Sequence, residues 1–206
     1  MFTSRSTINV LLLTWTVGVS AGFAALLHYK SVPADAHRPP RTWPEESRLR
    51  RPSGEKGTLV LFAHPKCPCT SASVSEIARL VSGPAHGLDV QVAIVRPAGV
   101  GADWDDTELE HRAASISGAS VVLDEEGVEA SRFRATASGF VVLYDAHGHL
   151  RFSGGLTSSR GHEGDSFGRR RILAVLSGRT PDRDDAPVFG CSLGISHHDS
   201  SAELGG

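Results

Sequence analysis

Twenty consecutive residues without a charge, from Ile8 to Leu27, are the feature that most limits what this chain can fold into. At the rise of an α-helix they span about 30 Å, the thickness of the hydrocarbon core of a bilayer. The run is apolar on every side, which is typical of a helix in lipid. Arg5 precedes it, and Tyr29 and Lys30 follow it as interfacial anchors. We therefore expect residues 1–30 to form an N-terminal membrane anchor.

A cleaved signal peptide is the alternative, because Ala34-Asp35-Ala36 offers a small-x-small cleavage site. The apolar run is long for a signal core, and this site lies well past its end, which favours a retained anchor. Residues 31–56 hold five of the 11 prolines. Proline-rich, mixed-charge sequence behaves as an extended tether, so we expect this segment to be a linker.

Beyond the linker, short apolar runs alternate with helical patterns. The patterns predict strands at 58–63, 90–95 and 119–123, helices at 71–81, 104–116, 128–134 and 167–176, and a hairpin of 140–144 with 149–153. Strands that alternate with helices imply a parallel sheet, to which the hairpin adds antiparallel strands. We expect one α/β domain over residues 57–180, with a central mixed sheet and helices on both faces. Residues 181–206 then form a largely polar C-terminal tail.

Charge and cysteine content exclude two classes of protein. The net charge is −2, with 21 basic and 23 acidic residues, so the chain lacks the basic excess of a nucleic-acid binder. Three cysteines in 206 residues are too few for a disulfide scaffold. An odd number of cysteines suggests at least one working thiol.

The candidate chemistry lies where the first predicted strand meets the first helix, at Lys66-Cys67-Pro68-Cys69. A cysteine before a helix N-terminus is next to unpaired amides and the positive end of the macrodipole, both of which favour an anion. Lys66 adds a cation that also favours the thiolate. A thiolate is the nucleophile of disulfide exchange and of peroxide reduction, so Cys67 is the predicted nucleophile and Cys69 the predicted resolving thiol.

The chain resembles the thioredoxin superfamily over roughly residues 57–180, and within it the membrane-tethered TlpA and ResA branch that includes the RedB proteins. The resemblance depends on four stretches: residues 61–69, 138–145, 154–157 and 159–165. It implies a thioredoxin-like fold with the thiol motif at the edge of the sheet. The activity it implies is thiol–disulfide oxidoreduction, with protein thiols or disulfides, or a small thiol, as substrates.

Two departures from the superfamily pattern bear on the site. The usual motif is Cys-x-x-Cys, whereas a Cys67–Cys69 bridge closes a very small ring, strained and readily reduced. The superfamily also places a cis-proline before the first hairpin strand, where this chain has Ser138-Gly139. These two residues are therefore the predicted substrate-binding pair.

Cys191 offers a second resolving thiol. It lies in Val188-Phe189-Gly190-Cys191, an apolar island in the tail, which suggests that the tail docks on the domain. A docked tail would bring Cys191 to Cys67 or Cys69 and close a larger, less strained loop. The alternative is a merely packed or exposed thiol.

Three other functions stay open. Cys67-Pro68-Cys69-Thr70 also reads Cys-x-x-Thr, which resembles the thiol peroxidases of this fold and adds peroxide as a substrate. His64, Cys67, Cys69 and Cys191 together are a possible soft-metal set for copper or zinc. A tethered domain that only binds a partner is the third. For the oxidoreductase we expect no bound organic cofactor, because the thiols carry the electrons.

Two further patterns concern orientation and a loop. Lys30, Arg38 and Arg41 after the span would place the domain in the cytoplasm by the positive-inside rule. The short N-terminal tail and the thiol chemistry favour export, so we expect a single-pass inner-membrane protein with a periplasmic domain.

Arg160 to Asp165 form a polar, glycine-rich loop before the last helix, either framing a site or simply solvated, with Asp165 or Ser166 as the helix cap.

Overall fold

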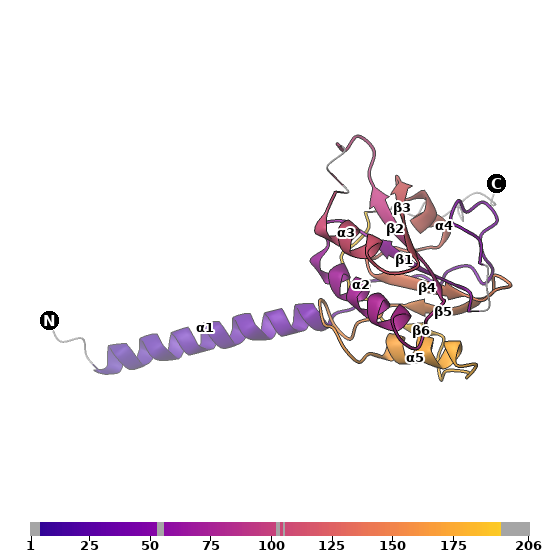
Figure 1. The fold of residues 1–206 in the computed structure, drawn as a ribbon. Coiled ribbons are helices and arrows are strands. Elements are labelled where there is room, and N and C mark those ends of the chain that lie inside the picture. The colour runs from indigo at the N-terminus through magenta and orange to yellow at the C-terminus, as the bar shows by residue number, and fades with distance from the viewer. Residues whose placement is uncertain (1–4, 53–55, 102–103, 105, 195–206) are drawn as a thin grey trace, which may run out of the picture. The chain divides into compact units, whose positions relative to one another are not determined.

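The computed structural model describes residues 5–52, 56–101, 104 and 106–194, and the chain divides after Val32 into two units. The first unit contains α1 (Arg5–Ser31), whose side chains are all exposed (Figure 1). Among the described residues, α1 is the one helix long and apolar enough to cross a membrane by length and composition, with a mean hydropathy of 2.0. The hydroxyls of Thr14 and Thr16 donate to carbonyls one turn earlier. The helix is therefore compatible with a single-pass anchor.

The second unit is built on a mixed sheet of six strands in the order β3-β2-β1-β4-β5-β6 (Figure 1). The pairs β1–β2, β2–β3 and β5–β6 are parallel, whereas β4 is antiparallel to both β1 and β5. The strands are β1 (Thr58–Ala63), β2 (Asp89–Arg96), β3 (Ala119–Glu125), β4 (Phe140–Tyr144), β5 (Leu150–Gly154) and β6 (Asp185–Ala186).

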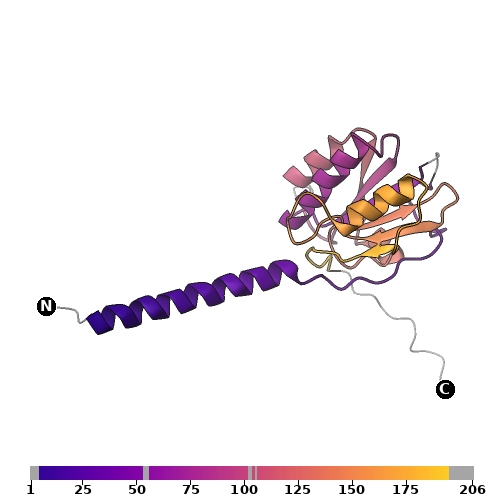
Figure 2. The same ribbon diagram turned by 90° about the horizontal axis from the view of Figure 1, so that it is seen from below.

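Four helices cover the two faces of this sheet: α2 (Pro68–Val81), α3 (Glu108–Ala114), α4 (Val128–Arg132) and α5 (Phe167–Leu176). Alternate residues of β1 point to opposite faces, and both sets are buried, which explains the continuous apolar run. Leu59 and Leu61 join a core with α2, α3 and α5, and α5 packs on β5 and β6 (Figure 2). Val60 and Phe62 join a second core with α4. The predicted fold class is confirmed.

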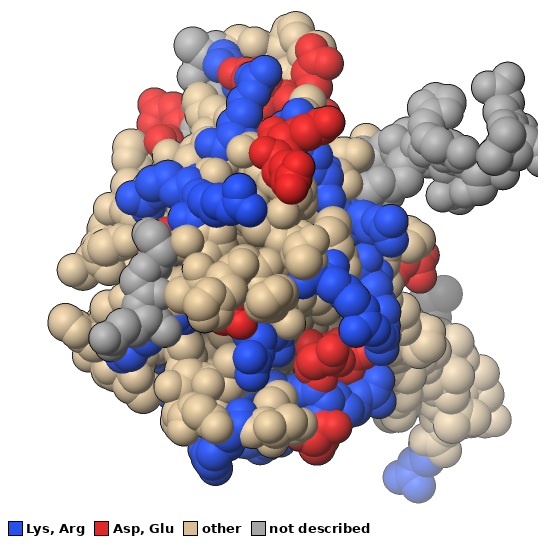
Figure 3. Space-filling model, turned by 90° about the vertical axis from the view of Figure 1, so that its right-hand side faces the viewer, with Lys and Arg blue, Asp and Glu red and all other residues tan. Residues whose placement is uncertain are grey.

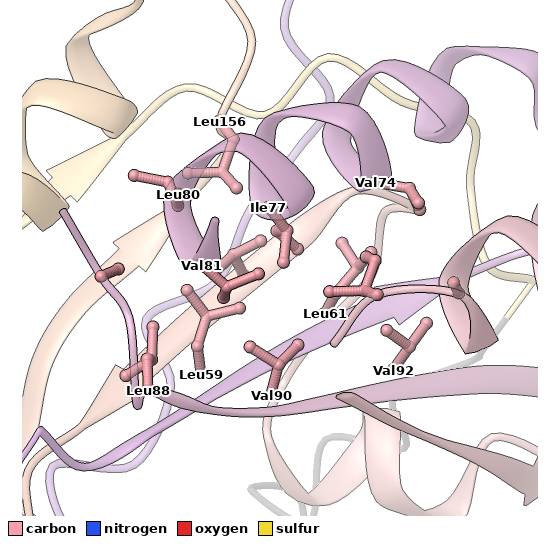
Figure 4. Close-up of a cluster of buried hydrophobic side chains, with 14 of the residues drawn as sticks. Leu59, Leu61, Val74, Ile77, Leu80, Val81, Leu88, Val90, Val92 and Leu156 are labelled. Carbon is pink, nitrogen blue, oxygen red and sulfur yellow. The ribbon is translucent and has the colours of Figure 1, made fainter. Parts of the chain in front are cut away.

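Figure 4 shows how α2 is held on the sheet. Val74, Ile77, Leu80 and Val81 recur at helical spacing and are buried in one cluster with β1 and β2 side chains, with Leu80 beside Leu156. All four are at most 6% exposed. Because this packing fixes the orientation of α2, it also fixes the N-terminal turn of the helix, which carries the Cys-Pro-Cys motif.

Several observed elements differ from the predicted ones by one or two residues at their ends, and three differences are larger. α2 begins at Pro68, three residues earlier than predicted, because proline is well suited to the first helical position. α3 begins only at Glu108, where the Thr107 side chain accepts the Glu110 N–H as an N-cap. The short strand β6 in the tail was not predicted.

Within the segment predicted to be a linker, residues 34–52 lie against the domain. Trp43 and Leu49 are 3% and 4% exposed and belong to the second core, and Trp43 packs edge-on against Phe133 and Tyr144. The segment is extended, but its backbone pairs with the domain, as in the bridge between Thr42 and His149. Burial of these two large apolar side chains outweighs the flexibility that the composition suggested.

Charged side chains of both signs are interspersed on the face of the second unit drawn in Figure 3. Over the unit as a whole, ion pairs include Arg50 with Asp89 and Arg170 with Asp165. This mixture agrees with the small net charge of the sequence.

Candidate active site

Sheet topology brings three distant segments to one end of β1. The chain leaves β1 at Ala63 and reaches Cys67 four residues later. Since β4 is antiparallel to β1 and Phe62 pairs with Phe140, the residues just before β4 lie beside the end of β1. β6 runs parallel to β5, and therefore in the direction of β1, so the tail emerges at this same end.

Cys67 is the N-cap residue of α2, with Pro68 in the first helical position. Its carbonyl accepts the Thr70 N–H at 3.2 Å, and its own N–H donates to the His64 carbonyl at 3.1 Å. The residue is 3% exposed. The motif is thus the first turn of the helix itself, and its leading thiol is held in a rigid and nearly closed site.

The tail docks as predicted, with Val188 only 1% exposed. It places the Cys191 Sγ 3.3 Å from the Cys67 Sγ, and all three cysteines are free thiols. Gly154 and Gly155 make this possible, since a Cβ on either residue would collide with the tail backbone at residues 186–187. The catalytic roles assigned to the cysteines stay predictions.

The two facing thiols have different acidities. Burial raises the pKa of Cys67, but hydrogen bonds with Thr70 and with Cys191 outweigh it and lower that pKa to about 7. Burial, together with its hydrogen bond to Cys67, raises the pKa of Cys191 to about 11. Cys67 is therefore the thiol of this pair that ionises first, and its thiolate can accept a hydrogen bond from the Cys191 thiol.

Cys69 is half-buried beside the same pair. Burial and the neighbouring Cys67 charge raise its pKa, while Arg160 acts in the opposite direction. The Arg160 guanidinium also donates to the Gly190 carbonyl, the residue before Cys191. Arg160 thus links Cys69 to the docked tail.

The Lys66 side chain contacts Trp104. Its Nζ lies over the ring of Trp104, 4.2 Å from the ring centroid. The groups that lower the pKa of Cys67 are instead Thr70 and Cys191. A stabilising role of Lys66 toward the thiolate stays a prediction.

Ser138 and Gly139 occupy the position predicted for substrate binding. The Ser138 Oγ accepts the His64 N–H at 2.8 Å and lies 2.5 Å from the Thr70 Oγ1. The Ser138 N–H donates to the Cys191 carbonyl at 2.8 Å, and the Gly139 N–H to that of Phe62. Gly139 has a φ of 89°, which favours glycine. Here, the backbone of Ser138 is bound by the tail, and its role toward a substrate stays a prediction.

The loop before α5 is held to α2 by a buried carboxylate. Glu76 is 0% exposed; its Oε1 accepts the Gly164 N–H at 2.7 Å, and its Oε2 lies 3.4 Å from the Arg169 Nε. Arg79 pairs with both Glu76 and Glu163. Ser166 is the N-cap of α5. The loop therefore carries Arg160 on a fixed support.

The predicted soft-metal ligands are not gathered into a close set. The His64 Nδ1 accepts the Lys66 N–H, and its ring packs edge-on against Trp104. In the part of the chain that the structure describes, the group of three or more such side chains whose ligand atoms all lie within 4.8 Å of one another consists of Asp106, Glu110 and His111. These are surface groups on and before α3.

No protein-family profile and no curated protein matches the chain. An uncharacterised conserved protein from Geobacillus kaustophilus superposes with a TM-score of 0.59 at 18% identity, over 81% of this chain and 93% of its own. A hypothetical protein from Sinorhizobium meliloti 1021 gives 0.58 at 18%, over 79% and 97%. A thioredoxin-like protein solved in its oxidised form gives 0.47 at 19%, over 69% and 97%. At these identities the likeness to the first two structures concerns the fold alone.

Sequence reasoning missed three contributors to the site. Thr70 was noted only as part of a peroxidase pattern, although its position three residues after an N-cap cysteine places it beside the sulfur. Arg160 was assigned to a polar loop without a link to the thiols. Gly190 was read as part of an apolar island, whereas its missing side chain is what lets the tail approach Ser138.

Proposed function

We propose that this chain is a thiol–disulfide oxidoreductase in which Cys67 is the nucleophile and Cys191 the resolving thiol. The supporting observation is the 3.3 Å contact between their sulfurs, across 124 residues of sequence. Bond formation requires the sulfurs to approach to about 2.05 Å, a shift that side-chain rotation can supply. Cys69, two residues from Cys67, would be the strained alternative.

The reaction runs in two exchanges. The Cys67 thiolate attacks a substrate disulfide, forms a mixed disulfide and releases one substrate thiolate, which takes up a proton. The Cys191 thiol then loses its proton and attacks the Cys67 sulfur. The second substrate thiolate leaves, and two electrons have passed from the Cys67–Cys191 pair to the substrate. A dithiol of a partner protein restores the reduced pair, and the reverse sequence oxidises a substrate.

We further propose that residues 1–30 hold this domain at the inner membrane, with the thiols in the periplasm, as in the tethered TlpA and ResA branch. An oxidising compartment is where a thiol pair of this kind has substrates. The helix α1 supports the anchor by its length and composition.

One experiment separates this function from its alternatives. The full chain, reduced in detergent and freed of metal, is oxidised mildly, digested without thiol scrambling and mapped by mass spectrometry. We expect a Cys67–Cys191 disulfide and loss of insulin reduction in Cys67→Ser. A Cys67–Cys69 bridge as the sole product would refute the role of the tail.

Peroxide is the matched second treatment. A stable sulfenic acid on Cys67, with no bridge, would favour the peroxidase instead. This alternative is supported by Thr70, whose hydrogen bonding lowers the pKa of Cys67. Stoichiometric copper or zinc in the chain as purified, lost on mutation of any cysteine, would favour the metal site.

A further inference from the structure

The tail is bound at the active site as an added strand. Ala137 and Ser192 form an antiparallel bridge, the Ser138 N–H donates to the Cys191 carbonyl at 2.8 Å, and the Leu193 N–H donates to that of Thr136 at 2.9 Å. Each of these bonds involves backbone groups only. The backbone of residues 136–138 is therefore a short binding edge, and the occupant is the chain itself.

The same segment closes the site over Cys67. With Cys191 against it, Cys67 is 3% exposed. A polypeptide disulfide cannot reach the sulfur of Cys67 while residues 190–193 are in place. Turnover on a polypeptide therefore requires the tail to leave, which bares the binding edge at the moment when Cys67 becomes accessible.

The attachment of residues 190–193 is limited. It consists of two backbone hydrogen bonds, the Arg160 bond to the Gly190 carbonyl and the burial of Leu193. Backbone pairing of this kind accepts many sequences, because the bonds do not involve the side chains. A segment that pairs with the edge must be extended and must have a free N–H at the position of Leu193. To react with Cys67 it must also carry a sulfur at the position of Cys191.

We propose that residues 190–193 are a tethered inhibitor, which occupies the edge 136–138 and must leave it before Cys67 can react with the extended segment of another polypeptide. The proposal rests on the function proposed above and adds a regulation of the same site. The partner strand pairs with the edge, and the Cys67 thiolate attacks its disulfide to give the mixed disulfide. The tail then returns, Cys191 attacks the Cys67 sulfur, and the partner leaves as a thiolate while its strand is displaced.

Gly190 allows the competition to be tested without touching a cysteine. A Cβ at this position would overlap the Ser138 carbonyl oxygen, and Gly190 does not have a positive φ. Gly190→Ala should therefore undock residues 190–193 without straining its own backbone. Gly83→Ala is the matched control, since its Cβ would meet the Arg79 carbonyl oxygen at an ordinary 3.4 Å and its φ is likewise not positive.

Both variants are made in the full chain carrying Cys69→Ser and Cys191→Ser, which leaves Cys67 as the single thiol. The probe is a peptide of residues 186–194 whose cysteine is a mixed disulfide with 2-thiopyridine. Attack by Cys67 joins the peptide to the chain and releases pyridine-2-thione, which is measured. The small disulfide 2,2′-dithiodipyridine reports the reactivity of Cys67 without strand pairing.

The measured quantity is the ratio of the peptide rate to the rate with the small disulfide. We expect this ratio to be at least about tenfold higher in Gly190→Ala than in the parent chain, and unchanged in Gly83→Ala. A peptide with N-methyl-leucine at the Leu193 position lacks the N–H that donates to Thr136 and should lose this gain. An unchanged ratio in a folded Gly190→Ala chain, or an equally fast N-methyl peptide, would overturn the proposal. If Gly190→Ala does not fold, Arg160→Gln, which removes the bond to the Gly190 carbonyl, gives the same comparison.

If Cys67 does not react with the small disulfide, the oxidoreductase function is refuted, independently of the binding edge. In that case the binding edge is still tested by fluorescence anisotropy, using a labelled peptide with serine in place of cysteine. Saturable binding to Gly190→Ala, weakened by N-methylation, supports the edge. Equal binding of both peptides, or no binding, rejects it.

Discussion

Replacing Cys191 by alanine should raise the pKa of Cys67. The structure lowers that pKa from 9.0 to about 7, although burial alone would raise it. At about 1.4 kcal/mol per pKa unit, the lowering corresponds to about 3 kcal/mol in favour of the thiolate. The side chains and backbones of Thr70 and Cys191 supply the hydrogen bonds responsible, so alanine, which removes the Cys191 thiol and keeps its backbone N–H, should reverse part of the shift.

The size of the effect follows from the strength of such bonds. A hydrogen bond to a charged group contributes about 1.5–3 kcal/mol, which is about one to two pKa units. The pKa of Cys67 in Cys191→Ala should therefore lie at about 8–9, and the thiolate fraction at pH 7 should fall from about one half to below about one tenth. The reactivity of Cys67, which in the parent rises with pH around 7, should rise only at higher pH.

The assay is a pH titration of thiolate ultraviolet absorbance in the full chain carrying Cys69→Ser, so that Cys67 is the remaining thiol in the variants. Cys191→Ser is the matched control, because its hydroxyl keeps a donor at the same place and should hold the pKa near 7. The reasoning is refuted if alanine and serine give the same midpoint, or if the parent titrates like an ordinary thiol near 9.0.

Three other outcomes are expected. Deletion of residues 1–30 should release a soluble, folded domain, checked by ultracentrifugation and circular dichroism; an aggregated product would contradict the anchor. Glu76→Ala leaves the Gly164 N–H without its acceptor and should lower the free energy of unfolding by about 1–3 kcal/mol, measured by urea denaturation against Glu163→Ala, which removes an exposed partner of Arg79. Lys66→Ala should leave the pKa of Cys67 near 7 by the same titration, because its ammonium lies over Trp104; a clear rise would restore Lys66 as the stabilising cation.

The elements that could be predicted are those whose sequence pattern is local. β1 and α5 have the predicted bounds, since an unbroken apolar run and a capped amphipathic stretch are sufficient signals. β6 could not be predicted, because two residues of ordinary composition carry no periodicity. Its existence depends on Gly154, which allows the tail backbone to approach β5.

The candidate site was predictable in its sulfurs but not in their surroundings. Helix-terminus chemistry identified Cys67, and the apolar island identified the docking of Cys191. What tunes the thiolate depends on tertiary contacts, so the nearest cation in sequence, Lys66, was chosen over Thr70. The docking of residues 34–52 was missed for the same reason: proline content describes an isolated chain and not the cavity that Trp43 fills.

The long separation of Cys67 and Cys191 has a consequence for the lifetime of the protein. A bond between them closes a loop of more than 120 residues, because the two positions are 124 apart. On chain-entropy grounds such a crosslink destabilises the unfolded state by about 4–5 kcal/mol. The reduced chain would then open globally about a thousand times more often than the oxidised one. Proteases act on opened chains, so a population kept reduced would be degraded first, and the abundance of the protein would follow the supply of oxidant.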